Sequence, residues 1–359
     1  MSSRMAYEIR EQPEALARTL DALLPLRGRV RALADGCDDV LLVARGSSDN
    51  AGVYGRYLLE IHSQHAASLA APSLATHYRV ERDLRRTLVV SLSQSGTTDE
   101  IVETQAWAAA HGARTVAIAN DGASQLATEA DLALVTAAGP ELAVPATKSY
   151  TAQLAAVAVL ADALGPSGRS LESELRRTPE QLARLLAAPD SVAAAVELLA
   201  APAPTLVSGR GLVYGTALEI ALKLEETCLQ SVRGLSYADL RHGPIAVVDP
   251  DLVAILVSAA DGPMLSGMIT LAEDLTERGA RILGIGGDAT FAGACDLRLP
   301  GPDLPELVAP LGLILPAQLT VEALARRRGL DPDAPRGLSK VTQTDLDPST
   351  RSSDGSNDD

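Results

Sequence analysis

The chain has 359 residues, 47% of them hydrophobic and only 3% aromatic, and its formal net charge is −15. This length suits two domains, and the scarcity of aromatic rings means that Ala, Leu and Val must fill the cores, as in layered α/β proteins. The acidic balance argues against nucleic acid or an anionic membrane as a partner, because both require a basic surface.

The first residues lack the apolar core of a signal peptide. Cys37, Cys228 and Cys295 are widely spaced, which indicates neither a disulfide framework nor a zinc site. Both features predict a cytoplasmic protein. The Ala-rich run at 152–164 is too short for a membrane span and contains Asp162, so it is interpreted as a buried helix.

Apolar, strand-like runs alternate with helical patterns along the chain, which predicts parallel, doubly wound sheets. The runs occur in two series, one at 40–48, 87–98, 115–120 and 132–139, and one at 205–211, 252–258, 281–287 and 297–300. Corresponding positions lie at similar offsets: Gly46 and Gly209 are 163 residues apart, and Ser93 and Ser258 are 165 apart. We therefore predict two copies of one domain.

The predicted domain boundaries follow from composition. A Gly-Pro-Ser-Gly segment at 165–168 and the charged helical stretch after it divide the chain into domains at 1–175 and 190–344. Residues 345–359 are rich in Ser, Asp and Gly, which predicts a disordered tail.

The run at 88–98 ends in a turn of hydroxyl, amide and glycine residues just before a helical pattern. The first N–H groups of a helix lack partners inside it, so an anion can satisfy them, and this segment fits a phosphate cradle. Taken alone, it also fits an ordinary Ser/Thr-capped turn. The corresponding turn of the second copy, at 258–263, has lost the Gln and most hydroxyls, which predicts an empty cradle and a single composite site.

Six segments, taken in order, make the chain similar to the sugar isomerase (SIS) family, and in particular to the isomerase portion of glucosamine-6-phosphate synthase and its stand-alone deaminase relatives. They are EIREQP at 8–13, GSS at 46–48, SLSQSGTT at 91–98, ALEIALKLEE at 217–226, LRHGP at 240–244 and DAPRGLSK at 333–340. The resemblance implies an α/β fold of two tandem SIS domains, each a doubly wound five-stranded parallel sheet flanked by helices.

The resemblance also implies four catalytic residues. Glu226 is the base that moves a proton between C1 and C2, a role that suits a partly buried carboxylate, and Lys223 lies on the same helix face. His242 opens the sugar ring and reaches the site of a neighbouring subunit in a homodimer. Lys340 engages the open-chain carbonyl. From local sequence alone, Lys223 and Glu226 also fit a surface ion pair, and Lys340 a solvated lysine.

The remaining predicted contacts hold the substrate, and they need no cofactor or metal. By resemblance, Gly46 and Val144 contact the sugar, and the phosphate is bound by Ser47, Ser48, Ser93, Gln94, Ser95 and Thr98. Three positions depart from the pattern of the synthase, namely Arg45, the Pro145–Ala146 pair and the Arg233–Gly234 pair. These departures concern the identity of the substrate more than the type of reaction.

The sequence predicts an isomerising deaminase that converts glucosamine 6-phosphate and water into fructose 6-phosphate and ammonia, reversibly. The synthase carries a glutaminase cysteine at the start of its chain, where this sequence has Ser2, so we expect free ammonia rather than glutamine. Two alternatives stay open, an enzyme of the same type acting on another sugar phosphate and a sugar-phosphate sensor. The turn at 44–50 lacks Gly-x-Gly-x-x-Gly, which argues against a dinucleotide enzyme.

Overall fold

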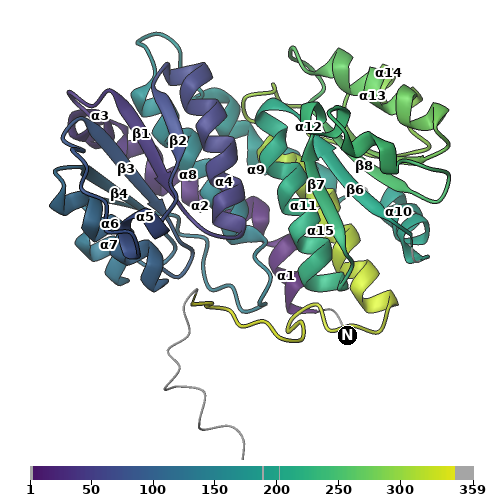
Figure 1. The fold of residues 1–359 in the computed structure, drawn as a ribbon, viewed down its shortest axis with the longest axis horizontal. Helices are drawn as coiled ribbons and strands as arrows, with labels where there is room; N and C mark the ends of the chain where they lie inside the picture. Colours follow the sequence, from purple (N-terminus) through teal and green to yellow (C-terminus); the bar gives the residue numbers. More distant parts are fainter. Residues whose placement is uncertain (1–2, 188–189, 202, 344–359) are drawn as a thin grey trace, which may run out of the picture.

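The structure is a computed structural model that describes residues 3–187, 190–201 and 203–343. It contains two parallel sheets of five strands each (Figure 1). The first has the order β2-β1-β3-β4-β5 and consists of β1 (Asp39–Val43), β2 (Ala66–Leu69), β3 (Thr87–Leu92), β4 (Arg114–Ala119) and β5 (Leu132–Val135). The second has the order β7-β6-β8-β9-β10 and consists of β6 (Thr205–Gly209), β7 (Val232–Ser236), β8 (Val253–Ser258), β9 (Arg281–Gly286) and β10 (Leu297–Leu299).

The two sheets share one topology, which confirms the predicted duplication. The central strands β1, β3 and β4 correspond in order and neighbours to β6, β8 and β9. Within the first sheet, Leu42 of β1 is in register with Leu69 of β2 on one side and Val90 of β3 on the other. The edge strands β2 and β7 were not predicted from the sequence because they are only partly buried and therefore lack a continuous apolar run.

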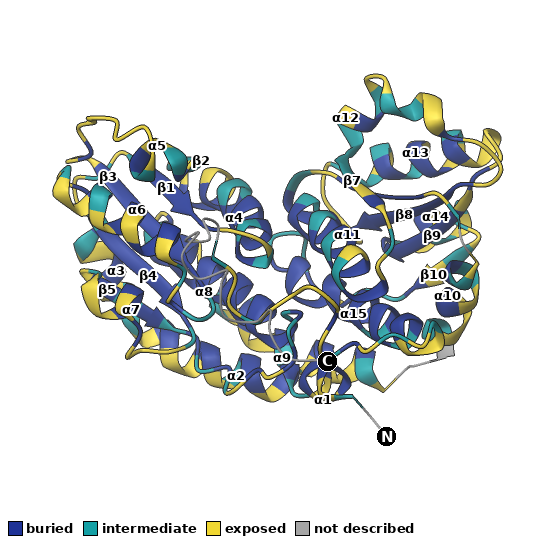
Figure 2. Cartoon of the chain, turned by 60° about the horizontal axis from the view of Figure 1, so that its bottom comes forward, coloured by how far each residue is buried: buried dark blue, intermediate teal, exposed yellow. Residues whose placement is uncertain are grey.

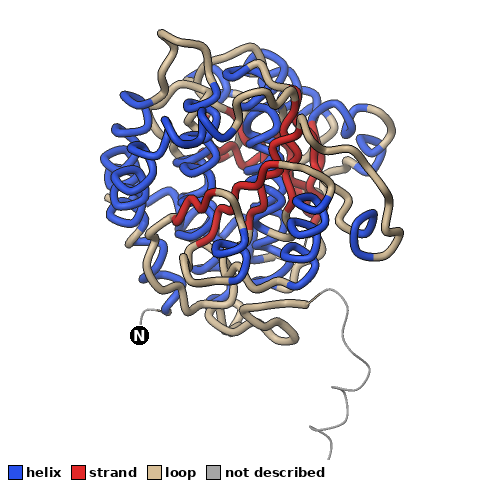
Figure 3. Tube along the Cα trace, turned by 90° about the vertical axis from the view of Figure 1, so that its left-hand side faces the viewer, coloured by secondary structure: helices blue, strands red, loops and turns tan. Residues whose placement is uncertain are grey.

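Helices cover both faces of each sheet, so the strands lie in the middle of the molecule (Figure 3). The helices before and within the first domain are α1 (Arg4–Arg10), α2 (Gln12–Leu23), α3 (Arg27–Leu33), α4 (Ser47–Leu58), α5 (Ser73–Thr76), α6 (Asp99–Ala110), α7 (Gln125–Glu129) and α8 (Lys148–Leu164). Those of the second are α9 (Glu172–Leu186), α10 (Asp190–Ala200), α11 (Tyr214–Cys228), α12 (Tyr237–Arg241), α13 (Leu265–Glu277), α14 (Ala289–Gly293) and α15 (Pro310–Arg327). Their outward faces carry most of the exposed residues (Figure 2).

The Ala-rich run forms α8, which is buried on nearly every side, as predicted. Its Asp162 is ion-paired to Arg27 at 2.7 Å, which explains how a helix interior accepts a carboxylate. Across the described ranges, no helix combines the length and apolarity that crossing a membrane requires. The predicted tail at 345–359 lies outside the described residues.

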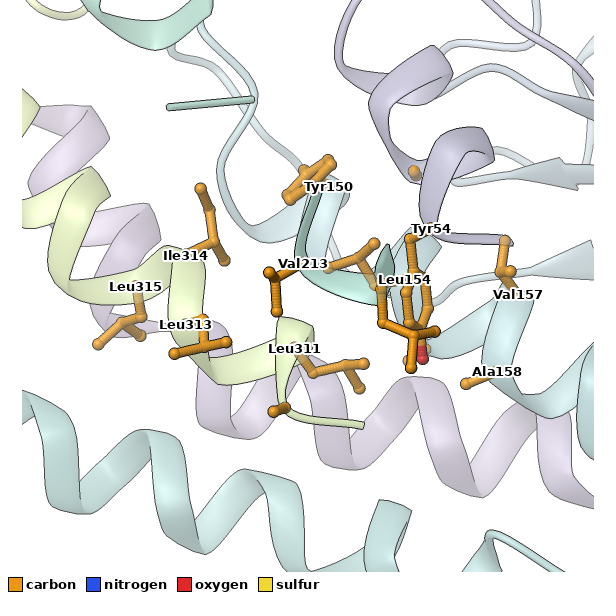
Figure 4. Packing of buried hydrophobic residues seen from close by; sticks show 14 of the residues in the cluster. Tyr54, Tyr150, Leu154, Val157, Ala158, Val213, Leu311, Leu313, Ile314 and Leu315 are labelled. Carbon is orange, nitrogen blue, oxygen red and sulfur yellow. The ribbon is translucent and has the colours of Figure 1, made fainter. Parts of the chain in front are cut away.

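One hydrophobic core extends through both domains. Figure 4 shows Tyr54 of α4 and Leu154 of α8 in the same cluster of buried side chains as Leu311 and Ile314 of α15. The Tyr54 hydroxyl crosses the boundary and donates to the carbonyl of Leu307 at 2.8 Å. Because burying this apolar surface is the main stabilising term, the domains hold each other in place, and a site formed between them is rigidly positioned.

The helices α4 and α11, which follow the first strand of each copy, cross at very short range (Figure 1). A Cβ added to Gly215 of α11 would lie 2.4 Å from the carbonyl oxygen of Asn50 in α4. Only glycine permits this approach. It brings the side chains of α11 against the amino end of α4, where the first predicted phosphate loop lies.

Candidate active site

A cavity of ≈ 560 Å³ lies where the carboxyl ends of β1 and β3 face α11 and the C-terminal segment. Every predicted site residue except His242 lines it: Gly46, Ser47, Ser48, Ser93, Gln94, Ser95, Thr98, Val144, Lys223, Glu226 and Lys340. Residues 338–343 close one side, and the yellow segment of Figure 1 shows the chain returning from the second domain to the first. Five segments far apart in sequence thus meet at the edge where α/β sheets bind ligands.

Two loops at the ends of neighbouring strands form the predicted phosphate end of the cavity. Helix α4 begins at Ser47, with Gly46 before it at φ 57°, and α6 begins at Asp99 after the loop of 93–98. Both loops direct helix N-terminal N–H groups toward the same cavity, and helix dipoles favour an anion there. The two loops thus lie at one cavity, and phosphate binding by them stays a prediction.

The 93–98 loop is held by its own hydroxyls. Ser93 Oγ accepts from the Gly96 N–H at 3.2 Å, and Ser95 Oγ accepts from the Thr97 N–H at 3.3 Å. Gly96 has φ 65°, and a Cβ there would lie 2.1 Å from Ser124 Oγ, so this glycine serves the turn and the packing beneath it. The side-chain amide of Gln343 caps α6, accepting from the Asp99 N–H at 3.0 Å.

The equivalent turn of the second domain contains carboxylates. Gly262 lies against Glu306, since a Cβ there would be 2.2 Å from Glu306 Oε2, and the Glu306 N–H donates to Asp261 at 2.8 Å. Burial and the nearby Asp261 raise the pKa of Glu306. Two acidic side chains in this turn argue against phosphate binding there.

Helix α11 presents three charged side chains to the cavity and its floor. Lys223 is ion-paired to Glu226 and lies 3.5 Å from Glu219, and its side chain is only 1% exposed. The Glu226 side chain is 25% exposed and reaches the cavity. The alternative interpretation of Lys223 and Glu226 as a surface ion pair is therefore wrong, because a solvated pair does not bury its lysine. Glu225, in contrast, is exposed.

Glu219 is a site residue that the sequence analysis did not single out. It is fully buried and accepts from Asn50 Nδ2 of α4 at 2.8 Å. Burial raises its pKa to about 7, although Lys223 and Asn50 oppose the rise. Its spacing offered a signal, since residues 219, 223 and 226 fall on one helix stripe.

Lys340 is docked rather than solvated. Its Nζ donates to Glu141 Oε2 and to the Ala143 carbonyl, both at 2.7 Å. Burial opposes ionisation of Glu141, but Lys340 and Ser149 outweigh it, and the pKa of this carboxyl lies below its ordinary value. Glu141 was also missed as an anchor. The Val144 N–H donates to the Asp333 carbonyl at 2.8 Å, so its own carbonyl is the group left for a sugar hydroxyl.

His242 lies outside the cavity. It follows α12 in the second domain, and its side chain is exposed. The geometry of a single chain therefore does not bring it to Glu226, and its service to a neighbouring subunit stays a prediction. Of the other histidines, His62 is buried, with Nε2 3.7 Å from Asp162 Oδ1.

Comparison with known proteins identifies the family to which the chain belongs. The SIS domain model matches residues 36–163 and 199–321, which is more than half of the chain and falls on both sheets. The chain belongs to the SIS domain family. The glutamine–fructose-6-phosphate aminotransferase [isomerizing] of Thermococcus kodakarensis is 33% identical over 350 residues, which cover 94% of this chain and 57% of that enzyme. This SIS chain thus spans little more than half the length of the curated relatives that it matches.

Two solved SIS structures share the whole architecture. The C-terminal domain of glucosamine-fructose-6-phosphate aminotransferase from Francisella tularensis superposes with a TM-score of 0.85 at 26% identity, covering 93% of this chain and 99% of that one. Glucosamine-6-phosphate deaminase from Thermotoga maritima superposes with a TM-score of 0.74 at 25% identity, and the match covers 95% of this chain and 100% of that one. The predicted fold class, two tandem SIS domains with five-stranded parallel sheets, is confirmed.

Proposed function

We propose that this SIS protein is an isomerising deaminase of an amino-sugar phosphate, which converts glucosamine 6-phosphate and water into fructose 6-phosphate and ammonia. The observation that carries the proposal is the placement of Glu226 and Lys223 in the same cavity as the two Ser/Thr loops and Lys340. The loops suit a phosphate, and the charged groups suit proton transfer at the other end of a hexose chain.

The proposed roles of Glu226 and Lys223 follow from the exposure of their side chains and from the contact between them. In the open-chain aldose with its amine protonated, Glu226 takes the C2 proton and delivers it to C1, while a proton of the C2 ammonium passes to the C1 oxygen, which leaves a C1 hydroxyl and a protonated imine at C2. Lys223 lies beside Glu226, and its ammonium stabilises negative charge that develops on the C1 oxygen. Ammonia then leaves C2, and water supplies the oxygen of the ketose.

Lys340 is proposed to act at C2, where its Nζ displaces ammonia from the imine and water then hydrolyses the resulting Schiff base to release the ketose and the lysine. This attack requires a neutral amine, so Lys340 first passes a proton to Glu141. Glu141 lies within 2.7 Å of that nitrogen and is the nearest group to take the proton. His242 is proposed to open the ring from the partner subunit of a homodimer, since its own chain leaves it exposed.

The Thermotoga maritima neighbour, named a glucosamine-6-phosphate deaminase, supports the proposal because its whole chain superposes on this one. The test measures ammonia and fructose 6-phosphate released from glucosamine 6-phosphate by the wild type and by Glu226→Gln. We expect turnover in the wild type and a loss of at least a hundredfold in the variant, as for removal of a general base. Sugar-phosphate binding without turnover in the wild type would reject the deaminase.

A second candidate is an enzyme of the same type that acts on another sugar phosphate. The observation that favours it is Arg45 at the cavity, together with Pro145 between the lining residues Val144 and Ala146. Assays with other 6-phosphorylated ketoses and ketosamines distinguish the two candidates. The buried Glu219–Lys223–Glu226 stripe argues against a sensor, because binding alone does not need a buried charged group.

A further inference from the structure

Arg45 occupies the junction between the two phosphate loops. It directly precedes the first loop and lines the cavity, and its side chain is 43% exposed. Its Nε donates to Glu100 Oε2 at 2.9 Å and its Nη2 to Glu100 Oε1 at 2.8 Å. Glu100 is in the first turn of α6, directly after the second loop. This bidentate pair therefore joins the loops that follow β1 and β3.

Acidic side chains surround the phosphate end of the cavity. Asp49 is in the first turn of α4, and Asp99 and Glu100 are in the first turn of α6. Burial raises the pKa of Asp49, and Arg45 opposes that rise, so the guanidinium acts on carboxylates of both helices. A phosphate dianion at these N-termini would be repelled unless a cation offset this charge.

The two other cations of the cavity are engaged elsewhere. Lys223 pairs with Glu226, and Lys340 pairs with Glu141. Arg45, in contrast, does not use all of its N–H donors in the hydrogen bonds that the structure describes. Glu100 takes two of its five N–H groups, and Ala44 O accepts a third from Nη1 at 3.4 Å. Within the part of the chain that the structure describes, two N–H groups thus remain for a ligand, and a guanidinium fork suits phosphate oxygens.

We propose that Arg45 binds the phosphate of the substrate through its guanidinium charge and makes this cavity selective for phosphorylated sugars, with Glu100 as a neighbour that binding does not require. The inference rests on the proposed function only in taking a sugar phosphate as the ligand. The competing explanation is that the pair merely ties the two loops together. The two explanations differ in what happens when Glu100 loses its charge and Arg45 keeps its own.

The experiment is isothermal titration of fructose 6-phosphate and of inorganic phosphate into the full chain and four variants. We expect Arg45→Ala to weaken the binding of both ligands by about tenfold or more, the range for a charged hydrogen bond. The affinity of Arg45→Lys should lie between those of the wild type and Arg45→Ala, because lysine keeps the positive charge but lacks the two-pronged guanidinium. Glu100→Gln should stay within about threefold of the wild type, because it leaves the guanidinium charge in place.

The matched control is Arg86→Ala. Arg86 pairs with Asp38 through both Nε and Nη2, and Asp38 and Arg86 directly precede β1 and β3 at the opposite edge of the sheet. This variant removes the same charge and the same kind of tie, away from the cavity, and should bind both ligands as the wild type does.

Three results would overturn the inference. Equal losses in Arg45→Ala and Glu100→Gln would show that the pair is a structural tie. Wild-type affinity in Arg45→Ala would show that Arg45 does not contact phosphate, and if that variant does not fold, wild-type affinity in Arg45→Lys shows that the fork is not used. A wild type that binds neither ligand rejects the proposed function itself, and with it this inference.

Discussion

Lys340 and Glu141 are 199 residues apart and form an ion pair of 2.7 Å that joins the end of the described chain to the first domain. The Glu141 side chain is fully buried and also accepts from Ser149 and from the N–H of Thr147. The pair fixes residues 338–343 as one side of the cavity. The cavity is therefore complete only when the C-terminal segment is docked.

The first prediction concerns Glu141→Gln. The change removes the charge that holds Lys340, so we expect the C-terminal segment to detach more often and kcat/KM to fall on the order of tenfold, equivalent to about 1.4 kcal/mol. Limited proteolysis should cut the segment faster in the variant. Glu180→Gln, which breaks an exposed pair with Arg184 on α9, is the control and should change neither quantity. Unchanged proteolysis in Glu141→Gln would contradict the docking role.

The Lys340–Glu141 ion pair also predicts how docking of the C-terminal segment depends on pH. The pKa of Glu141 in the folded chain lies below its ordinary value of 4.5. The stabilisation that the ionised carboxylate gives to the docked segment is therefore complete above pH 4.5, and it is lost as the pH falls through the lowered pKa. Proteolysis of the C-terminal segment in the wild type should therefore accelerate in acid below pH 4.5, and not between pH 6 and pH 8.

The crossing of α4 and α11 predicts the effect of Gly215→Ala. A Cβ 2.4 Å from the Asn50 carbonyl forces the helices apart, and overpacking of this kind costs about 1–3 kcal/mol of unfolding free energy. Activity should fall too, because the Asn50–Glu219 hydrogen bond spans the same crossing. Chemical denaturation and kinetics measure both effects.

Gly267→Ala in α13 is the matched control for that variant. A Cβ there meets Tyr237 at an ordinary 3.7 Å. Alanine also favours a helix over glycine by about 1 kcal/mol, so this control should be as stable as the wild type or more so, with unchanged activity. Equal stability of the two variants would show that the helix crossing tolerates a side chain.

The sequence predicted most of the fold because the central strands of each copy are continuous apolar runs ending in glycine turns. It did not predict the edge strands β2 and β7: the residues of β2 alternate between exposure and partial burial, and those of β7 are mostly partly buried. In the site, local motifs identified the loops and α11. Glu141 was not predicted as an anchor, because its role depends on a contact 199 residues away that no local pattern encodes.

Glu219 predicts a pH dependence of stability. Its pKa is raised to about 7 in the folded chain, mainly by burial, from an ordinary 4.5. The folded state therefore holds this proton more tightly than the unfolded state, and the unfolding free energy contributed by Glu219 falls as the pH rises from 4.5 through about 7. Glu219→Gln should remove that slope, so between pH 5 and pH 8 the wild type should lose roughly 1–3 kcal/mol relative to the variant.

Denaturation with urea at several pH values measures this difference. Glu8, Asp49 and Glu306 also have raised pKa values, so the wild type alone would mix their contributions with that of Glu219. Subtracting the variant isolates one group. Parallel curves for wild type and variant would contradict the assignment.

The last prediction tests whether His242 serves the site of a partner subunit. Glu226→Gln and His242→Asn should each be inactive as homodimers, the first through loss of the base and the second through loss of ring opening. If the two residues of one site come from different chains, a heterodimer of these variants contains one intact site and one doubly altered site. Random reassociation of equal amounts should then restore about a quarter of wild-type activity. If His242 acted within its own chain, every site in the mixture would lack one of the two groups, and no activity would return. Substantial activity of His242→Asn on its own would instead remove His242 from the mechanism.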